Sequence, residues 1–424
     1  MIILAIETSC DETSVAVVRA QGGLKIPKFK VLANIVLSQI KTHAKWGGVV
    51  PSLAKREHAK NLIPILEKAL KQSKLFANSK SQITNYKQIS NSKLKILNKI
   101  LSREPELLKQ FLEFMPKIKT PKINAIAVTV GPGLEPALWV GINFAKALSL
   151  VWNKPIIAVN HMEGHIAAVL LQNSGIFNFQ FPISKQIPNS KFKIPKIRFP
   201  AVALLVSGGH TELVLIKNWL DYKIIGETRD DAAGECFDKA ARMLGLPYPG
   251  GPAVATAAKA GPNHKSQITN YKSKQEIRLP RPMIDSNDYD FSFSGLKTAV
   301  LYLLKDLEKK VSKKSDRLKL TPFICKELQQ AIIAVLIVKT LRAAKEFKAK
   351  TIILGGGVVA NKELRKQMKL AVSKNLPTSN LQLPTSIFST DNAAMIAAAG
   401  YLHALKDDCA KPDKLKAQGN LTFK

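Results

Sequence analysis

Two histidines, His161 and His165, have the residue type and the spacing of metal ligands. They stand in the run His161-Met-Glu-Gly-His165, directly after the apolar stretch 156–159 and the good helix N-cap Asn160. A spacing of four residues places both imidazoles on one face of a helix, one turn apart, where they can share a metal ion. From this run alone, two partly buried histidines without a ligand role remain the alternative.

The order of residues within this run argues against a zinc peptidase. Such enzymes use H-E-x-x-H, in which the glutamate directly after the first histidine is the general base. Here Met162 follows His161, and Glu163 comes one place later, so a glutamate base would point elsewhere. The best third ligand is Asp391, just before an alanine-rich predicted helix, and capping of that helix is its alternative role.

Glycine-rich turns at the ends of predicted strands favour a nucleotide site. Leu205-Val-Ser-Gly-Gly-His-Thr211 joins two strands, and its backbone amides could face a phosphate. Gly355-Gly-Gly-Val-Val-Ala-Asn361 precedes a helix at 362–369, and Gly131-Pro-Gly133 precedes another. The chain has neither a P-loop nor a Rossmann fingerprint, and each turn alone is weak evidence because tight turns need glycine anyway.

The acidic run Asp230-Asp-Ala-Ala-Gly-Glu-Cys-Phe-Asp238 opens a predicted helix. Carboxylates at a helix start stabilise the helix dipole, which is the simpler explanation of the run. Asp238 lies two turns into the helix, beyond the range of that effect. Together with Gly250-Gly251 it could instead bind ribose or substrate hydroxyl groups.

Short apolar strands alternate with helical patterns, which is typical of an α/β fold with mixed sheets. A hairpin opens each half of the chain, near Ile2 and near Val202, which indicates two lobes of like topology. We predict an N-terminal lobe at 1–200, a second lobe at 201–391, and a C-terminal helix and tail at 392–424 that return to the first lobe. The main predicted helices are 141–152, 232–244, 296–307, 327–347 and 393–405.

The net charge of +33 would draw the protein to polyanions, of which nucleic acid is the usual one. Much of this charge lies in three stretches rich in Lys, Asn and Ser, near 76–121, 180–198 and 263–279. The string Lys80-Ser-Gln-Ile-Thr-Asn-Tyr-Lys87 of the first recurs as Lys265-Ser-Gln-Ile-Thr-Asn-Tyr-Lys272 in the third. We expect low-complexity insertions on surface loops, which either bind RNA phosphates or are solvated segments without a role.

Composition also indicates the compartment. The four cysteines are scattered without a C-x-x-C pair, which suits a reducing cytoplasm and argues against disulfides or a thiolate zinc site. No apolar run reaches the roughly 18 to 20 residues that a membrane helix needs. The N-terminal run Met1-Ile-Ile-Leu-Ala-Ile6 is followed at once by acidic residues, so we expect a first strand and not a signal peptide.

Nine motifs stand in one order along nearly the whole chain outside the three insertions, and in this order they resemble the TsaD family of bacterial tRNA threonylcarbamoyladenosine transferases, once described as glycoproteases. They are Ile6-Glu-Thr-Ser-Cys-Asp-Glu-Thr-Ser14, Gly47-Gly-Val-Val-Pro51, His161-Met-Glu-Gly-His165, Leu205-Val-Ser-Gly-Gly-His-Thr211, Asp230-Asp-Ala-Ala-Gly-Glu-Cys-Phe-Asp-Lys239, Tyr248-Pro-Gly-Gly251, Asp290-Phe-Ser-Phe-Ser-Gly-Leu-Lys297, Gly355-Gly-Gly-Val-Val-Ala-Asn361 and Ser389-Thr-Asp-Asn392. One departure is Ser52, which replaces a usual family glutamate after Pro51, so no role is carried over there.

The resemblance implies a two-lobed fold like that of actin, Hsp70 and sugar kinases, with mixed sheets and a central cleft. It also implies a metal-dependent acyltransferase that moves the threonylcarbamoyl group of threonylcarbamoyl-AMP to N6 of adenosine 37 in ANN-decoding tRNAs and releases AMP. Its implied partners are tRNA and TsaB-like and TsaE-like subunits, with no membrane. A metallopeptidase and a non-catalytic scaffold remain alternatives, while the histidine run is foreign to the kinases of this superfamily.

The resemblance further implies one divalent metal ion per subunit, Fe²⁺ first with Zn²⁺ or Mg²⁺ as alternatives, held by His161, His165 and Asp391. No general base is evident. The donor is already an activated mixed anhydride, so the enzyme mainly has to position and polarise it. The family's substrate contacts map onto Leu205, Val206, Ser207, Gly208, Gly209, Asp238, Gly251 and Asn361.

Overall fold

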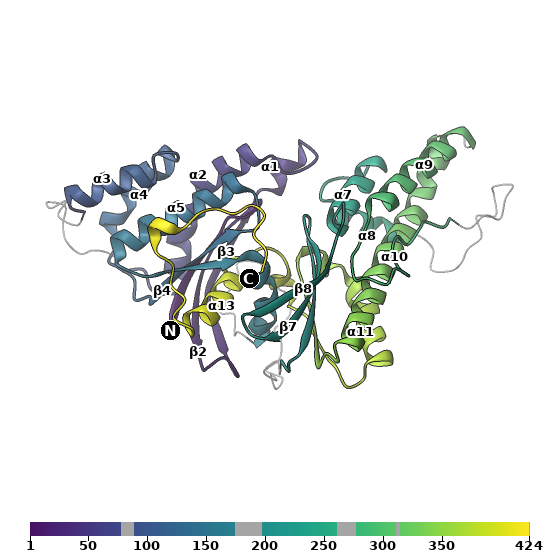
Figure 1. The fold of residues 1–424 in the computed structure, drawn as a ribbon. Helices are drawn as coiled ribbons and strands as arrows, with labels where there is room; N and C mark the ends of the chain where they lie inside the picture. The colour runs from purple at the N-terminus through teal and green to yellow at the C-terminus, as the bar shows by residue number, and fades with distance from the viewer. Residues whose placement is uncertain (78–88, 174–196, 261–276, 311–313, 424) are drawn as a thin grey trace. The chain divides into compact units, whose positions relative to one another are not determined.

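Two five-stranded mixed sheets organise the chain in a computed structural model, which describes residues 1–77, 89–173, 197–260, 277–310 and 314–423 (Figure 1). One sheet has the order β3-β2-β1-β4-β5 and the other β10-β9-β6-β7-β8. In each, three consecutive strands form an antiparallel meander whose first strand pairs in parallel with a later strand. The sheets therefore share one topology, and the predicted α/β fold with mixed sheets is confirmed.

The chain divides into two compact units, each built around one of these sheets. The first comprises Met1–His43, Val49–Lys196 and Pro384–Lys424, and the second comprises Ala44–Gly48 and Ile197–Leu383. The predicted lobe boundaries at 200 and 391 stay a proposal about folding domains. The central cleft that the family resemblance implies likewise stays a prediction.

In the first unit, helices cover both faces of the sheet. Leu4 and Ile6 of β1 share one core with residues of α2 and α5, such as Leu62 and Phe144. The helix α13 packs on the opposite face, where Gly400 touches the Ala127 side chain. The elements are β1 Ile2–Glu7, β2 Glu12–Gln21, β3 Lys28–Ser38, β4 Ala125–Gly131, β5 Ile156–Asn160, α1 Ile40–Ala44, α2 Pro51–Gln72, α3 Asn91–Ile100, α4 Pro105–Phe114, η1 Met115–Lys117, α5 Glu135–Trp152, α6 His161–Ala167, η2 Ala168–Asn173, α12 Ser386–Ser389, α13 Ala393–Ala404 and η4 Pro412–Lys414.

The prediction of a surface loop near 76–121 is wrong for the helices α3 and α4. Ser90 caps α3 by accepting a hydrogen bond from Lys93 N at 3.4 Å, and Pro105 stands in the first turn of α4. Leu97 and Phe111 are fully buried in the core of the first unit. The many Lys, Asn and Ser residues of this segment made its apolar residues at helical spacing hard to recognise. The two copies of the repeated string, and most of the other two stretches, lie outside the described residues.

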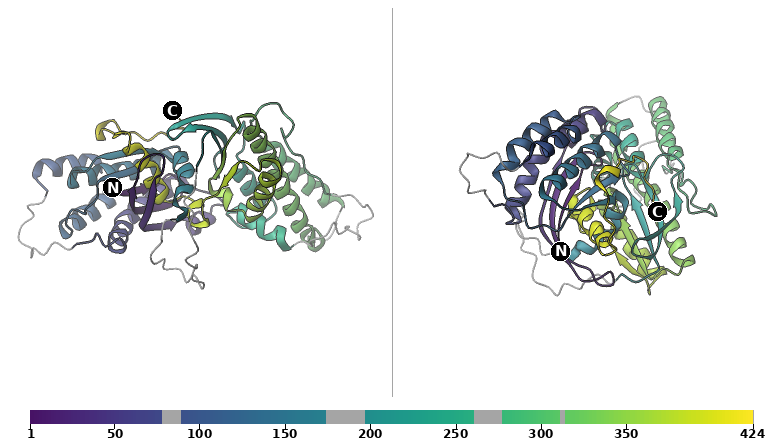
Figure 2. Two further views of the ribbon diagram at one scale, coloured as in Figure 1. Left: turned by 90° about the horizontal axis from the view of Figure 1, so that it is seen from below. Right: turned by 60° about the vertical axis from the view of Figure 1, so that its left-hand side comes forward.

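In the second unit, the helices α7 to α11 pack against the sheet face that carries Val202, Leu204 and Val206 (Figures 1 and 2). The elements are β6 Ala201–Val206, β7 Thr211–Asn218, β8 Asp221–Glu227, β9 Thr351–Gly355, β10 Asn380–Gln382, α7 Ala233–Met243, α8 Gly250–Ala260, α9 Ser294–Lys310, α10 Lys314–Glu346, η3 Gly357–Ala360 and α11 Lys362–Asn375.

The helix α10 is longer and more apolar than the sequence predicted. It begins at Lys314 and not at the predicted 327, and it continues through Pro322. Its part Leu318–Glu346 is long and apolar enough, by length and composition, to cross a membrane. Ile332 and Leu336 are nevertheless fully buried in the core of the second unit, so this is a core helix.

A buried hydrogen-bond network ties α2 to the loop after β1. His58 Nε2 donates to the Cys10 carbonyl oxygen at 2.9 Å, so Nδ1 carries no proton in the neutral ring and accepts from Thr13 Oγ1 at 2.8 Å. Gln39 extends the network to His43, whose Nε2 is 3.0 Å from Gln39 Oε1. Burial lowers the pKa of His58 to about 4, because the folded protein disfavours the charged ring.

We expect the free energy of unfolding to fall as the pH drops from about 6.5 to about 4, since the unfolded chain then binds a proton at residue 58 that the folded chain refuses. The lowered pKa of His58 corresponds to a loss of about 3 kcal/mol in the free energy of unfolding over this pH range. Urea unfolding at pH 7 and pH 4.5 should show a smaller acid loss for His58→Gln than for the unmodified chain.

The control is His403→Gln. Burial opposes charging of His403, but Glu163 and Asp408 outweigh it and raise the pKa, so this variant should steepen the acid loss. An acid loss in His58→Gln equal to that of the unmodified chain would contradict the assignment.

Candidate metal centre and nucleotide-binding loops

The histidine pair lies on the short helix α6, which begins directly at the end of β5. Asn160 caps this helix as predicted, since its Oδ1 accepts a hydrogen bond from Met162 N at 2.8 Å. All seven helix residues are buried, and His165 is fully so. The helix start at the end of β5 thus places both imidazoles in the interior of the first unit.

Asp391 meets both rings from the link between α12 and α13. Its Oδ1 lies 3.4 Å from His161 Nε2 and 3.2 Å from His165 Nε2. The three ligand atoms lie within 4.8 Å of one another, close enough to hold one metal ion. The alternative of a helix cap is wrong for Asp391, because Asn392 caps α13 and accepts from Met395 N at 3.1 Å.

The electrostatics of this cluster follow from the fully buried carboxylate of Glu7 and the partly buried carboxylate of Asp391 beside one pair of rings. Burial alone would raise the pKa of Asp391, but His161 and His165 outweigh it, and the pKa is lowered. Burial opposes charging of His161, yet Asp391 and Glu7 raise the pKa of that ring well above its usual value. Burial and the neighbouring His161 lower the pKa of His165.

His165 supplies the test of whether a metal ion fits. Both of its ring nitrogens are buried, and neither makes a hydrogen bond of good geometry to any residue the structure describes. An orphaned buried nitrogen costs about 1–3 kcal/mol, so such groups normally have a partner. A metal ion on Nε2 would provide one, and two imidazoles with one carboxylate are a normal ligand set for a divalent transition metal.

Glu163 does not face the three candidate ligands. Its Oε2 lies 2.6 Å from His403 Nε2, and His403 Nδ1 lies 2.8 Å from Asp408 Oδ2. The glutamate inside the histidine run therefore joins α6 to the end of α13. A peptidase base at this position is not supported.

Two residues behind His161 were not predicted from the sequence. Glu7, at the end of β1, has its Oε2 3.1 Å from His161 Nδ1, and Ser9 Oγ lies 3.1 Å from the same nitrogen. A glutamate that ends an otherwise apolar strand was the signal that could have identified this position.

In the second unit, the predicted glycine-rich turns gather at one edge of the sheet. Since β6 and β9 are parallel neighbours, the loops after them lie at the same edge. Gly356 has φ +94°, and a Cβ on it would overlap the Val206 carbonyl oxygen. Gly234, at the start of α7, donates its amide to the Ser207 carbonyl oxygen at 3.2 Å. The two loops and a helix N-terminus thus meet around the backbone of 206–207.

The individual predicted contacts are placed as follows. Leu205 and Val206 belong to β6 and their side chains are fully buried, so only their backbone could face a ligand. Ser207 is half-buried, and Gly208 and Gly209 are exposed with open space where a side chain would stand. These last three residues are the accessible part of the loop.

Two further predicted residues hold helix starts. Asp238 Oδ1 accepts from Gly250 N at 2.7 Å, next to Gly251, whose Cα faces open space. Asn361 Oδ1 caps α11, and its Nδ2 donates to Gln329 Oε1 at 2.8 Å. The contact of Gln329 was not predicted, because no local pattern in a long helix marks which of its polar residues reaches this loop.

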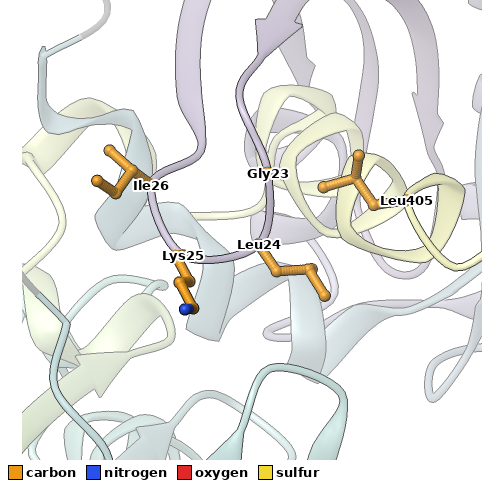
Figure 3. Close-up of a pocket in the computed structure, with 5 residues that line it drawn as sticks. All are labelled: Gly23, Leu24, Lys25, Ile26 and Leu405. Carbon is orange, nitrogen blue, oxygen red and sulfur yellow. The ribbon is translucent and has the colours of Figure 1, made fainter.

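A hollow of about 500 Å³ lies beside the turn between β2 and β3 (Figure 3). Gly23, Leu24, Lys25 and Ile26 of the β2–β3 turn line it together with Leu405, which follows α13. Asp391 precedes the other end of α13, a helix of 12 residues, so about 18 Å of helix separates the two. The hollow is therefore no part of the candidate metal centre.

Fold and site together define a class: an α/β protein with one sheet topology used twice, a buried His-His-Asp cluster in one unit, and glycine-rich strand-end loops in the other. The family model described as "TsaD: tRNA N6-adenosine threonylcarbamoyltransferase" matches residues 30–84, 102–187 and 185–398. Relatives named tRNA N6-adenosine threonylcarbamoyltransferase include one from Thermosipho africanus, 39% identical over 99% of both chains, and one from Persephonella marina, 39% identical over 95% of this chain and 90% of that one. The chain belongs to the TsaD family.

Similar solved structures include T. kodakarensis HypF and a ROK hexokinase from Thermus thermophilus. HypF has a TM-score of 0.44 and 12% identity, covering 74% of this chain and 45% of that chain. The hexokinase has a TM-score of 0.38 and 12% identity, covering 96% and 100%.

We predict that Gly356→Ala lowers the free energy of unfolding by about 1–3 kcal/mol, because the new Cβ meets the Val206 backbone at a positive φ. Gly357→Ala is the matched control, since nothing lies within 4 Å of its Cβ position. Denaturant unfolding of the two variants measures the difference, and equal stabilities would refute the close approach of the two loops.

Proposed function

We propose that this chain transfers the threonylcarbamoyl group of threonylcarbamoyl-AMP to N6 of adenosine 37 in tRNAs that read ANN codons, releasing AMP. The observation that carries the proposal is the match to the TsaD family along nearly the whole chain. The relatives that match it bear the name of this activity. A bond forms between N6 and the carbamoyl carbon, the bond from that carbon to the phosphate oxygen breaks, and N6 loses a proton.

The nucleotide half of the donor is proposed to bind the strand-end loops of the second unit. This placement is supported by the way residues 207–209, Gly356 and the N-terminus of α7 lie together. Backbone amides at such a place favour a phosphate group. Asn361, held by Gln329, and Asp238, held at the start of α8, would bound the nucleoside. Because the donor is already activated, positioning accounts for most of the catalysis required of these residues.

His161, His165 and Asp391 are proposed to hold one divalent metal ion per subunit. Two histidines and one carboxylate with open positions suit Fe²⁺ best, Zn²⁺ next, and Mg²⁺ poorly, since Mg²⁺ prefers oxygen ligands. When bound, the ion would supply Lewis acidity for the carbamoyl or phosphate oxygens. The rigid α6 and the capped start of α13 orient the three side chains.

The proposed partners are tRNA and two protein subunits like TsaB and TsaE, in the cytoplasm and away from membranes. The excess of 64 Lys and Arg over 31 Asp and Glu favours a polyanionic partner. The family resemblance supports the two subunits.

The test is formation of modified adenosine from threonylcarbamoyl-AMP and unmodified tRNA, with the partner subunits present. We expect His165→Ala to lower the rate by about 100-fold or more, since metal-ligand loss removes the Lewis acid. His403→Ala is the matched control, because it removes a partly buried histidine that touches none of the three ligands. No product from the unmodified chain, where a family member works under the same conditions, would refute the function.

A further inference from the structure

The two ring nitrogens of His161 face two different carboxylates. Nε2 lies 3.4 Å from Asp391 Oδ1 within the candidate metal centre, whereas Nδ1 lies 3.1 Å from Glu7 Oε2 behind it. Glu7 is fully buried and is the last residue of β1. Its carboxylate therefore contacts Nδ1, the ring nitrogen that a metal ion on Nε2 would leave free.

Neighbouring donors fix the orientation of the Glu7 carboxylate. Ser9 N donates to Oε1 at 2.6 Å, and Thr129 Oγ1 donates to Oε2 at 2.5 Å. Thr129 lies on β4, the parallel neighbour of β1, and is itself fully buried. With both oxygens engaged, the carboxylate cannot turn away from His161.

This arrangement determines which nitrogen of His161 carries the proton. An ionised carboxylate only accepts hydrogen bonds, so Nδ1 must donate, and in the neutral ring the lone pair is on Nε2. Ser9 Oγ, at 3.1 Å, can accept from the same Nδ1 proton. The lone pair then points toward Asp391 and His165, as a ligand atom must.

We propose that Glu7 is the positioning residue that makes His161 an Nε2 metal ligand and thereby sets the metal affinity of the cluster. The proposal rests on the metal centre of the proposed function. Glu7 acts through His161 and would touch neither substrate nor metal. A carboxylate behind a ligand histidine orients the ring and makes it a stronger donor, and losing it typically weakens metal binding by about 10–100-fold.

The decisive variant is Glu7→Gln, which keeps the shape but not the charge. Its amide oxygen can still accept from Ser9 N, while its NH₂ group faces His161 Nδ1 and Thr129 Oγ1. The Nδ1 proton would then oppose another donor, so the proton moves to Nε2, the ligand atom. Metal binding must be weakened even though the fold retains its contacts.

The experiment measures Co²⁺ and Zn²⁺ dissociation constants of the purified full chain by competition with a chromophoric chelator, with the Co²⁺ absorption spectrum as a second readout. We expect Glu7→Gln to raise both constants by about 10–100-fold and to change the Co²⁺ spectrum. Glu163→Gln is the matched control. It neutralises another buried carboxylate on α6 that engages His403 and no ligand, so its constants should equal those of the unmodified chain.

Two results would overturn the proposal: an unchanged metal affinity in Glu7→Gln, or an equal loss in Glu163→Gln. If Glu7→Gln fails to fold, Glu7→Asp tests the same point, because it retains the charge but withdraws it from Nδ1. Transfer activity of the unmodified chain is assayed separately, so failure of the proposed function is distinguishable from failure of the Glu7 assignment.

Discussion

The placement of the fully buried Glu7 and the partly buried Asp391 on either side of His161 is the constraint on which the first unit depends. A buried carboxylate costs several kcal/mol unless it is paired and hydrogen-bonded. These two are paired through a single imidazole, at 3.1 Å and 3.4 Å. The end of β1, the start of α6 and the link before α13 must therefore meet at one point, although they are distant in sequence.

The helix α13 shows how this meeting is enforced. Helix starts leave free backbone amides, and here side chains of the sheet accept their hydrogen bonds. Ala393 N donates to Ser14 Oγ at 2.9 Å, and Ala394 N donates to Asn34 Oδ1 at 3.2 Å. The strands β2 and β3 thus hold the helix start that presents Asp391, and the C-terminal part of the chain completes a site begun at residue 7.

The two sheets share one topology but present different chemical groups, because different residues stand at the ends of their parallel strands. In the first unit, β1 and β5 end in Glu7 and Asn160, so side-chain oxygens and then imidazoles fill the sheet edge. In the second unit, β6 and β9 end beside Ser207 and Gly356, and the edge offers backbone amides. The scaffold fixes where the edge lies, and the residues at the strand ends decide which groups line it.

Local patterns made much of this predictable. A spacing of four residues after a capped strand end located the histidine pair, and a hairpin at the start of each half indicated the repeated sheet. The helices α3 and α4 were missed because abundant lysines concealed buried positions such as Leu97 and Phe111. Glu7 and Gln329 were missed for another reason. Their roles depend on contacts with residues far along the chain, which no local pattern encodes.

The charge around the candidate metal centre also favours a cation there. The chain carries +33 overall, but Glu7, Asp11, Glu12 and Asp391 crowd the candidate metal centre. Burial, and after it the charges of Asp391 and Asp11, raise the pKa of Glu12 well above its usual value. An anionic adenylate would be repelled from such a place. A divalent cation proposed to lie on the two histidines and Asp391 would offset two of these negative charges and would weaken that repulsion.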